Sequence, residues 1–133
     1  MKKIKGLIIM LLISLSLFGM TACDDANGKA STYEQITAEQ AKTIMENEKD
    51  YVIIDARTDE EFAEGHIENA ILIPEYEITN RAEKELPDKE QLILVYCRSG
   101  RRSKIASEEL VKLGYSNVKE FGGIIDWPYE TVK

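Results

Sequence analysis

The stretch Gln91-Leu-Ile-Leu-Val-Tyr96, followed directly by Cys97-Arg-Ser-Gly-Arg-Arg102, decides the fold. The run before the cysteine is nearly all apolar, and both of its faces should be buried, as in the middle of a parallel sheet. A helix is expected over residues 103–113, with Gly114 as its C-terminal cap. The sequence therefore predicts a strand, a short loop and a helix, with the loop at the carboxyl end of the strand.

Weaker patterns before and after this strand, loop and helix predict further elements. Thr37 and Gln40 match a capping box and predict that a helix begins there. Further elements are expected at residues 51–55 (strand), 70–73 (strand), 76–86 (helix) and 117–121 (strand). Strands that alternate with helices predict an α/β fold, with a parallel sheet covered by helices on both faces. A length of 133 residues without an internal repeat fits a single domain.

The composition excludes some classes of function. The chain carries 17 Lys and Arg against 24 Asp and Glu, a net charge of −7. Such an acidic chain is not expected to bind nucleic acid, which requires a basic surface to neutralise phosphates. Two cysteines and one histidine leave little room for a zinc site, which typically has four N or S ligands. We therefore expect no metal and no organic cofactor.

The N-terminus is predicted to be an export signal. Three lysines precede an apolar run from Leu7 to Met20, which is shorter than the ~20 residues that span a bilayer as a helix. This pattern is typical of a signal peptide, expected at residues 1–22, and an uncleaved membrane anchor is the alternative. Met20-Thr-Ala-Cys23 resembles the lipobox of bacterial lipoproteins, although Leu is usual at the position of Met20. That resemblance implies a diacylglycerol on Cys23.

Processing would change how the protein is held at the membrane. Without the three N-terminal lysines the chain has 14 basic and 24 acidic residues, a net charge of −10. Anionic lipids repel such a surface, so lipid would have to anchor it. We expect residues 23–32 to be the lipidated N-terminus and a flexible tether, and residues 33–133 to be the folded domain. The predicted location is the outward face of a cell membrane, on the periplasmic side or the cell surface.

Cys97 is the candidate nucleophile. Ligands of open α/β sheets bind beyond the carboxyl ends of the strands, where Cys97 is expected to face loop N–H groups and a helix N-terminus. Both favour a thiolate, and Gly100 would let successive N–H groups point inward around an anion. Three of the chain's five arginines lie in this loop. Taken singly, the cysteine could be an inert buried thiol and the arginines a solvated charge run; together they predict an anion-binding catalytic loop.

The residues present favour sulfur transfer over acyl transfer. Acyl transfer needs a base and an acid, whereas His66 lies elsewhere in the sequence and nothing else resembles a Cys–His pair. A thiolate can attack the outer sulfur of thiosulfate without such help, because sulfite leaves as a weakly basic anion. The product would be a persulfide on Cys97.

The chain resembles the rhodanese family. The resemblance covers residues 33–127 and rests on the order and spacing of several short motifs: Asp55-Ala-Arg57, Glu61-Phe62, Gly65-His-Ile-Glu-Asn-Ala-Ile-Leu-Ile-Pro74, the loop Cys97 to Arg102, and Gly122-Gly-Ile-Ile-Asp-Trp127. It implies a five-stranded parallel sheet flanked by helices and a persulfide on the loop cysteine. By this resemblance the backbone of the loop binds the anion, through Arg98, Ser99, Gly100, Arg101 and Arg102. The side chains of Arg102 and Arg98 would bind the sulfur donor.

The length of the loop distinguishes a sulfurtransferase from related phosphatases and arsenate reductases. Related phosphatases and arsenate reductases resemble Cys-x₅-Arg, whereas here Arg102 comes one residue earlier and Ser103 occupies that position. The leading interpretation is a membrane-tethered sulfurtransferase of the thiosulfate:cyanide class. Its expected partners are a small anionic donor such as thiosulfate and a thiol or cyanide-like acceptor. The alternatives are a binding or persulfide-carrier module that acts on an envelope partner and, less favoured, a phosphatase or arsenate reductase.

Other residues are expected to be structural. His66 belongs to a segment that is structural in the family that this chain resembles. Asp55 and Arg57 are expected to form a buried ion pair rather than a catalytic one. Asn69 stands where glycine is usual in that segment, and asparagine tolerates a positive φ. Trp127 is expected to cap the core.

Overall fold

The computed structural model describes residues 32–133, in which no helix is long and apolar enough to cross a membrane. The strands are β1 (Glu34–Gln35), β2 (Tyr51–Asp55), β3 (Ala70–Leu72), β4 (Leu92–Cys97) and β5 (Val118–Gly123). The α-helices are α1 (Ala38–Asn47), α2 (Asp59–Glu64), α3 (Ile78–Glu85) and α4 (Arg101–Lys112). Two 3₁₀ helices, η1 (Glu75–Glu77) and η2 (Ile124–Asp126), complete the fold. The predicted signal peptide, the lipid attachment at Cys23 and most of the predicted tether lie outside the described residues.

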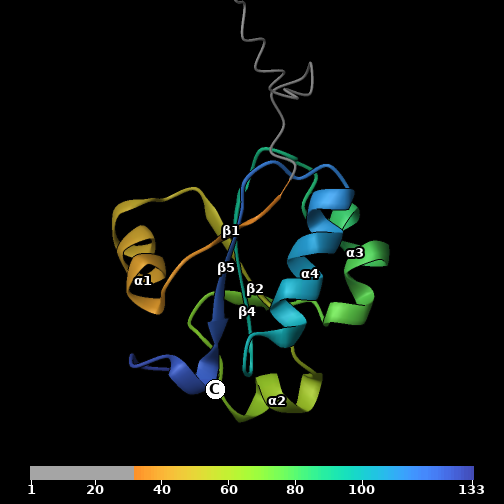
Figure 1. Cartoon of the computed structure of the whole chain (residues 1–133). Helices are drawn as coiled ribbons and strands as arrows, with labels where there is room; N and C mark the ends of the chain where they lie inside the picture. Colours follow the sequence, from red (N-terminus) through yellow and green to blue (C-terminus); the bar gives the residue numbers. More distant parts are fainter. Residues whose placement is uncertain (1–31) are drawn as a thin grey trace, which may run out of the picture.

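The five strands form one parallel sheet in the order β1-β5-β4-β2-β3. Figure 1 shows α1 on one face of this sheet and α3 and α4 on the other, with α2 below the strand ends. β4 lies in the middle, which explains its nearly uninterrupted apolar sequence. The predicted α/β fold, with a five-stranded parallel sheet and helices on both faces, is confirmed.

Alternation along β4 sends its side chains into two cores. Ile93, Val95 and Cys97 belong to the core under α3 and α4, whereas Leu94 and Tyr96 belong to the core under α1. β5 follows the same rule, because Val118 belongs to the same core as Cys97, whereas Phe121 belongs to the same core as Tyr96. The nucleophile candidate and its neighbour Tyr96 therefore lie on opposite faces of the sheet.

The main predicted elements are confirmed, with one correction at the loop. Helix α4 begins at Arg101 rather than at Ser103. Gly100 adopts a left-handed conformation (φ 103°) as the N-cap, so helical geometry starts at the next residue. Two arginines thus occupy the first turn, where the helix dipole disfavours cations. This placement is unfavourable for the helix itself and suits an anion at its N-terminus.

One strand and one α-helix were not predicted from the sequence. β1 is two residues long and, within residues 32–133, pairs only with β5. Helix α2 is six residues long and begins at a capping box in which Thr58 and Glu61 bond each other's backbone N–H groups. The capping-box spacing was readable in the sequence, but the short charged helix has no apolar stripe to accompany it.

Candidate active site

Cys97 ends β4 and opens the loop that leads into α4. Its side chain is 1% exposed, and the Gly100 N–H donates a hydrogen bond to its Sγ at 3.0 Å. The positive φ of Gly100 turns this N–H inward. The sulfur therefore sits beside an inward-facing amide and the N-terminus of α4, both of which favour a negative charge there.

Two glycines of β5 form the wall behind the loop. A Cβ atom on Gly123 would lie 2.0 Å from the carbonyl oxygen of Arg98, so a larger residue cannot fit without moving the loop. The same Arg98 carbonyl accepts a hydrogen bond from the Ile125 N–H at 3.2 Å. Gly122 has a positive φ of 87°. The Gly122-Gly123 pair thus allows β5 and the loop to approach closely.

A buried polar cluster lies directly beneath the loop. The Ser103 hydroxyl is 3.4 Å from Cys97 Sγ, 3.0 Å from the carbonyl oxygen of Gly100 and 2.6 Å from Glu120 Oε1. Glu120 is 3% exposed and also accepts the Gly122 N–H at 2.8 Å. A carboxylate therefore lies one hydroxyl away from the candidate nucleophile.

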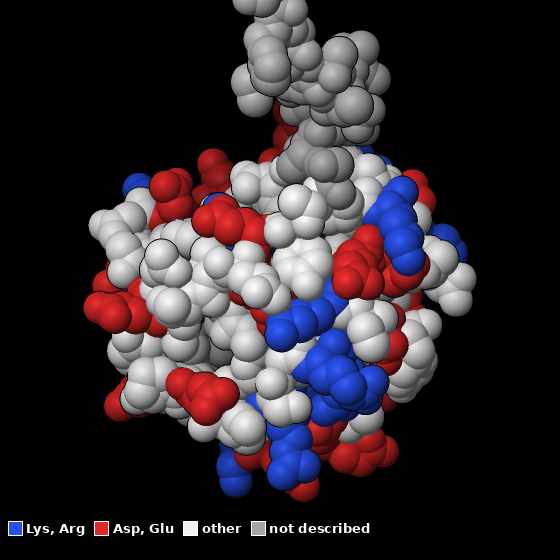
Figure 2. Space-filling model, in the orientation of Figure 1, with Lys and Arg blue, Asp and Glu red and all other residues white. Residues whose placement is uncertain are grey.

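The three loop arginines are not equivalent. Arg102 donates two hydrogen bonds to the Glu61 carboxylate, at 2.7 and 2.8 Å. These bonds, together with those from Thr58, lower the pKa of Glu61 from 4.5 to about 2. Arg98 and Arg101 are exposed, and within residues 32–133 neither has an ion-pair partner. Figure 2 shows basic side chains gathered around the N-terminal end of α4. Arg98 and Arg101 are thus free to meet an anion, whereas Arg102 would have to leave Glu61.

Asp55 lies in a closed network on the other side of β4. It is fully buried and accepts hydrogen bonds from Arg57 and, at 2.6 Å, from the Tyr96 hydroxyl. The Ile67 N–H in turn donates to the Tyr96 oxygen at 3.0 Å. Burial, and then the Asp55 charge, raise the pKa of Tyr96. The prediction of a buried Asp55–Arg57 ion pair is confirmed.

His66 lies against α2 rather than in the loop. Its ring stacks on Phe62 with a centroid distance of 3.7 Å, and its Nδ1 lies 3.0 Å from the Phe62 carbonyl oxygen. Its backbone exchanges two hydrogen bonds with Val132. Asn69 has a φ of 67°, and Trp127 packs against the core under α1. These residues hold the fold together, as the sequence indicated.

Comparison with known proteins agrees with this geometry. A family model, the rhodanese-like domain, matches residues 37–128. The chain belongs to this family. The rhodanese-like domain is 39% identical over 80 residues to the thiosulfate sulfurtransferase PspE of Escherichia coli, covering 60% of this chain and 77% of that protein. It is 36% identical over 94 residues to a sulfurtransferase of Allochromatium vinosum, covering 70% and 86%.

Solved structures show the same fold. A structure described as rhodanese with anions from E. coli superposes with a TM-score of 0.59 and 37% identity, covering 62% of this chain and 98% of that one. A rhodanese-like domain protein of Staphylococcus aureus gives a TM-score of 0.65 and 34% identity, covering 73% and 93%. The rhodanese-like fold therefore accounts for nearly the whole length of both solved chains.

The structure places all six predicted loop residues around one rhodanese-like strand end, and it adds three that the sequence analysis missed. Ser103 was expected only as the start of a helix, Glu61 only as part of a family motif, and Glu120 not at all. A signal for Glu120 was available, because in a strand with alternating faces it lies on the same side as the apolar Val118.

Proposed function

We propose that the protein is a sulfurtransferase that moves sulfane sulfur from thiosulfate, or a similar donor, to a thiophilic acceptor through a persulfide on Cys97. The observation that carries this proposal is the sulfur of Cys97 beside the Gly100 N–H, with two unpaired arginines on the loop. The family and its sulfurtransferase relatives support the class of activity.

The proposed reaction has two displacement steps. The Cys97 thiolate attacks the outer sulfur of thiosulfate, the S–S bond of the donor breaks, and sulfite leaves with the electron pair. The acceptor then attacks the outer sulfur of the persulfide, and the Cys97 thiolate is the leaving group. Exposed Arg98 and Arg101 would attract the dianionic donor, and the inward N–H of Gly100 would stabilise the negative sulfur.

The loop is less suited to a phosphate ester. Only four residues separate Cys97 from Arg102, and a phosphatase-type loop would have its arginine at the position of Ser103. Instead, the Ser103 side chain points down to Glu120.

The direct test is production of thiocyanate from thiosulfate and cyanide, with Cys97→Ala beside the native protein. We expect turnover by the native protein and none above background for Cys97→Ala. Ser107→Ala is a matched control. Its buried hydroxyl lies one turn after Ser103 on α4 and has no hydrogen-bond partner among the described residues. Equal turnover by Cys97→Ala would contradict the proposal. A stable persulfide without thiocyanate would assign the carrier role instead.

We further propose that lipid on Cys23 holds the enzyme at a membrane facing outward. The support is the basic start, the short apolar run and the residues before Cys23. Cells fed labelled fatty acid should label the native protein in the membrane fraction. Cys23→Ser should lose the label and leave the membrane, and unchanged fractionation of that variant would overturn the tether.

A further inference from the structure

Glu120 is a buried acid without a basic partner. It is 3% exposed on β5 and, within residues 32–133, forms no ion pair. Its Oε1 accepts hydrogen bonds from the Ser103 hydroxyl at 2.6 Å and from the Gly122 N–H at 2.8 Å. Desolvating a carboxylate without a countercharge is costly, so its position next to the nucleophile calls for a chemical explanation.

The hydrogen bonds around Ser103 define a direction. Its hydroxyl has one hydrogen, and its shortest contact is with Glu120, at 2.6 Å against 3.0 Å for the Gly100 carbonyl oxygen. Cys97 Sγ, at 3.4 Å, can then donate its own hydrogen to Ser103 Oγ. The resting order is thus Cys97 S–H to Ser103 O–H to the Glu120 carboxylate.

The same contacts also satisfy the reverse order. If the Cys97 proton passes to Ser103 Oγ and the original Ser103 proton passes to Glu120, the Ser103 hydroxyl donates back to the thiolate. Glu120 is then a neutral carboxylic acid that donates to Ser103. Both arrangements carry one negative charge in total, whereas a thiolate beside a carboxylate would place two like charges in a buried site.

We propose that Glu120, acting through Ser103, is the positioning residue that holds the Cys97 proton while the sulfur is anionic. This inference rests on the proposed function. The proton leaves Cys97 S–H for Ser103 and that of Ser103 goes to Glu120, so the thiolate forms without a proton entering solvent. The persulfide anion that follows faces a neutral Glu120. When the acceptor removes the outer sulfur, the proton returns to Cys97 by the same route.

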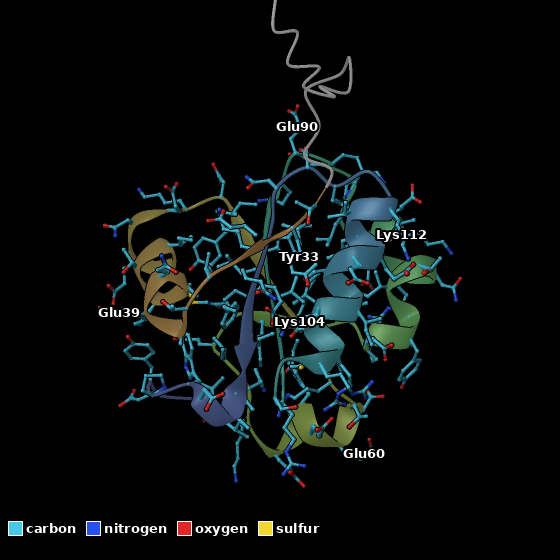
Figure 3. All side chains as sticks on the ribbon, in the orientation of Figure 1. Tyr33, Glu39, Glu60, Glu90, Lys104 and Lys112 are labelled. Atoms are coloured by element: carbon cyan, nitrogen blue, oxygen red, sulfur yellow. The ribbon has the colours of Figure 1, made fainter. Side chains whose placement is uncertain are left out.

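Other charged groups face this relay of Cys97, Ser103 and Glu120 from several elements. The loop and α4 contribute Arg102, which interacts electrostatically with Cys97, and the solvent-exposed cations Arg98, Arg101 and Lys104. Figure 3 labels Lys104 near the start of α4, on the side toward β5. Helix α2 contributes Glu61, which Arg102 already neutralises, and β1 contributes the uncharged Gln35 opposite Glu120. Arg102 favours negative charge on the sulfur, and Glu120 is the acid that contacts Ser103.

The test is the rate at which iodoacetamide alkylates Cys97, measured against pH on the Cys97 peptide of the full chain so that Cys23 does not interfere. Two coupled groups give two steps, so the native protein should show partial reactivity at low pH and a second rise at high pH. Glu120→Gln keeps an oxygen acceptor for Ser103 and Gly122 but cannot take a proton. It should give one step, with at least about a tenfold loss of rate near pH ~5.

Four more variants make the test specific. Ser103→Ala should lose a similar factor at low pH, and the double variant should lose no more than either single one, because the residues act as one unit. Ser107→Ala and Glu108→Gln, an exposed acid on the same helix, should match the native profile. Thermal unfolding would show that each variant is folded.

Opposite outcomes are distinguishable. If Glu120 only repels the thiolate, Glu120→Gln will react faster at low pH, which would overturn the relay. Profiles of the same shape, or losses that multiply in the double variant, would overturn it as well. Alkylation needs no sulfur donor, so a protein that fails the thiocyanate assay can still show the two-step profile. Failure of the proposed function and failure of this inference are therefore separate results.

Discussion

Two buried carboxylates near the carboxyl ends of inner strands of the sheet are held in different ways. Asp55 ends β2 and accepts hydrogen bonds from the backbone N–H and guanidinium of Arg57 and from the Tyr96 hydroxyl, and the guanidinium neutralises its charge. Within residues 32–133, Glu120 on β5 accepts hydrogen bonds only from a hydroxyl and a backbone N–H. A fully paired acid stabilises the fold and does nothing else, whereas an unpaired acid beside a thiol can exchange a proton. The difference assigns structure to one and chemistry to the other.

Breaking the Asp55 pair should have the largest effect on stability. Arg57→Met leaves a buried charge unpaired, and we expect the free energy of unfolding to fall by about 3–5 kcal/mol in a denaturant titration. Arg81→Met is the control, because Arg81 pairs with Glu77 and Glu85 at the surface, where the loss should be under about 1 kcal/mol. A loss for Arg57→Met no greater than the control would contradict the structural role of Asp55. Glu120→Gln should cost about 1 kcal/mol or less.

Removing the Tyr96 hydroxyl should have an intermediate effect. Tyr96→Phe leaves one Asp55 oxygen and the Ile67 N–H each without this partner, so we expect a loss of about 1–3 kcal/mol. The two-step alkylation profile of Cys97 should keep its shape, because Tyr96 lies on the other face of β4. Tyr76→Phe, at an exposed position, is the matched control and should unfold like the native protein. A one-step profile in Tyr96→Phe would show that the Asp55 network also controls the reactivity of Cys97, which would contradict the separate roles of the two acids.

The Glu61–Arg102 pair should give the smallest effect, and one that depends on pH. Glu61 has a pKa of about 2 in the folded protein, held below the usual 4.5 mainly by the hydrogen bonds from Arg102. The pair therefore stabilises the fold above pH 4.5 and loses this contribution as the pH falls toward 2. Glu61→Gln should cost about 1 kcal/mol at neutral pH, because the pair is partly exposed.

The control for this pH dependence is Glu60→Gln, on the same first turn of α2 but without an ion pair among the described residues (Figure 3). Urea titrations from pH 7 downward should show the gap between native and Glu61→Gln shrinking below pH 4.5. A gap that stays constant down to pH 2 would show that the pair does not lower the pKa of Glu61.

The sequence was sufficient for the features that depend on local pattern. The apolar run of β4, the glycine and arginines of the loop, and the Asp55–Arg57 motif have fixed spacings, and the structure bears out the fold that they predict. The helix start was misplaced by two residues, because the left-handed Gly100 closes the first turn earlier than side-chain patterns indicate. Such caps depend on backbone conformation and leave no apolar periodicity.

The part of the site that the sequence did not predict depends on contacts between distant segments. Glu120 and Ser103 are 17 residues apart, and Glu61 and Arg102 are 41 apart. Without the strand order, a charged residue in β5 cannot be placed beside Cys97 rather than in solvent. The sequence therefore indicated no base beside the nucleophile, whereas the parallel pairing of β4 with β5 places Glu120 one hydroxyl away from Cys97.

The most direct test of the whole account is the mass of the Cys97 peptide after the full chain has been incubated with thiosulfate. We predict one added sulfur atom on Cys97, which cyanide removes as thiocyanate. Cys97→Ala should gain no sulfur anywhere in the domain. If the native protein, folded and treated with thiosulfate or with polysulfide, carries no added sulfur on Cys97, the central claim is wrong.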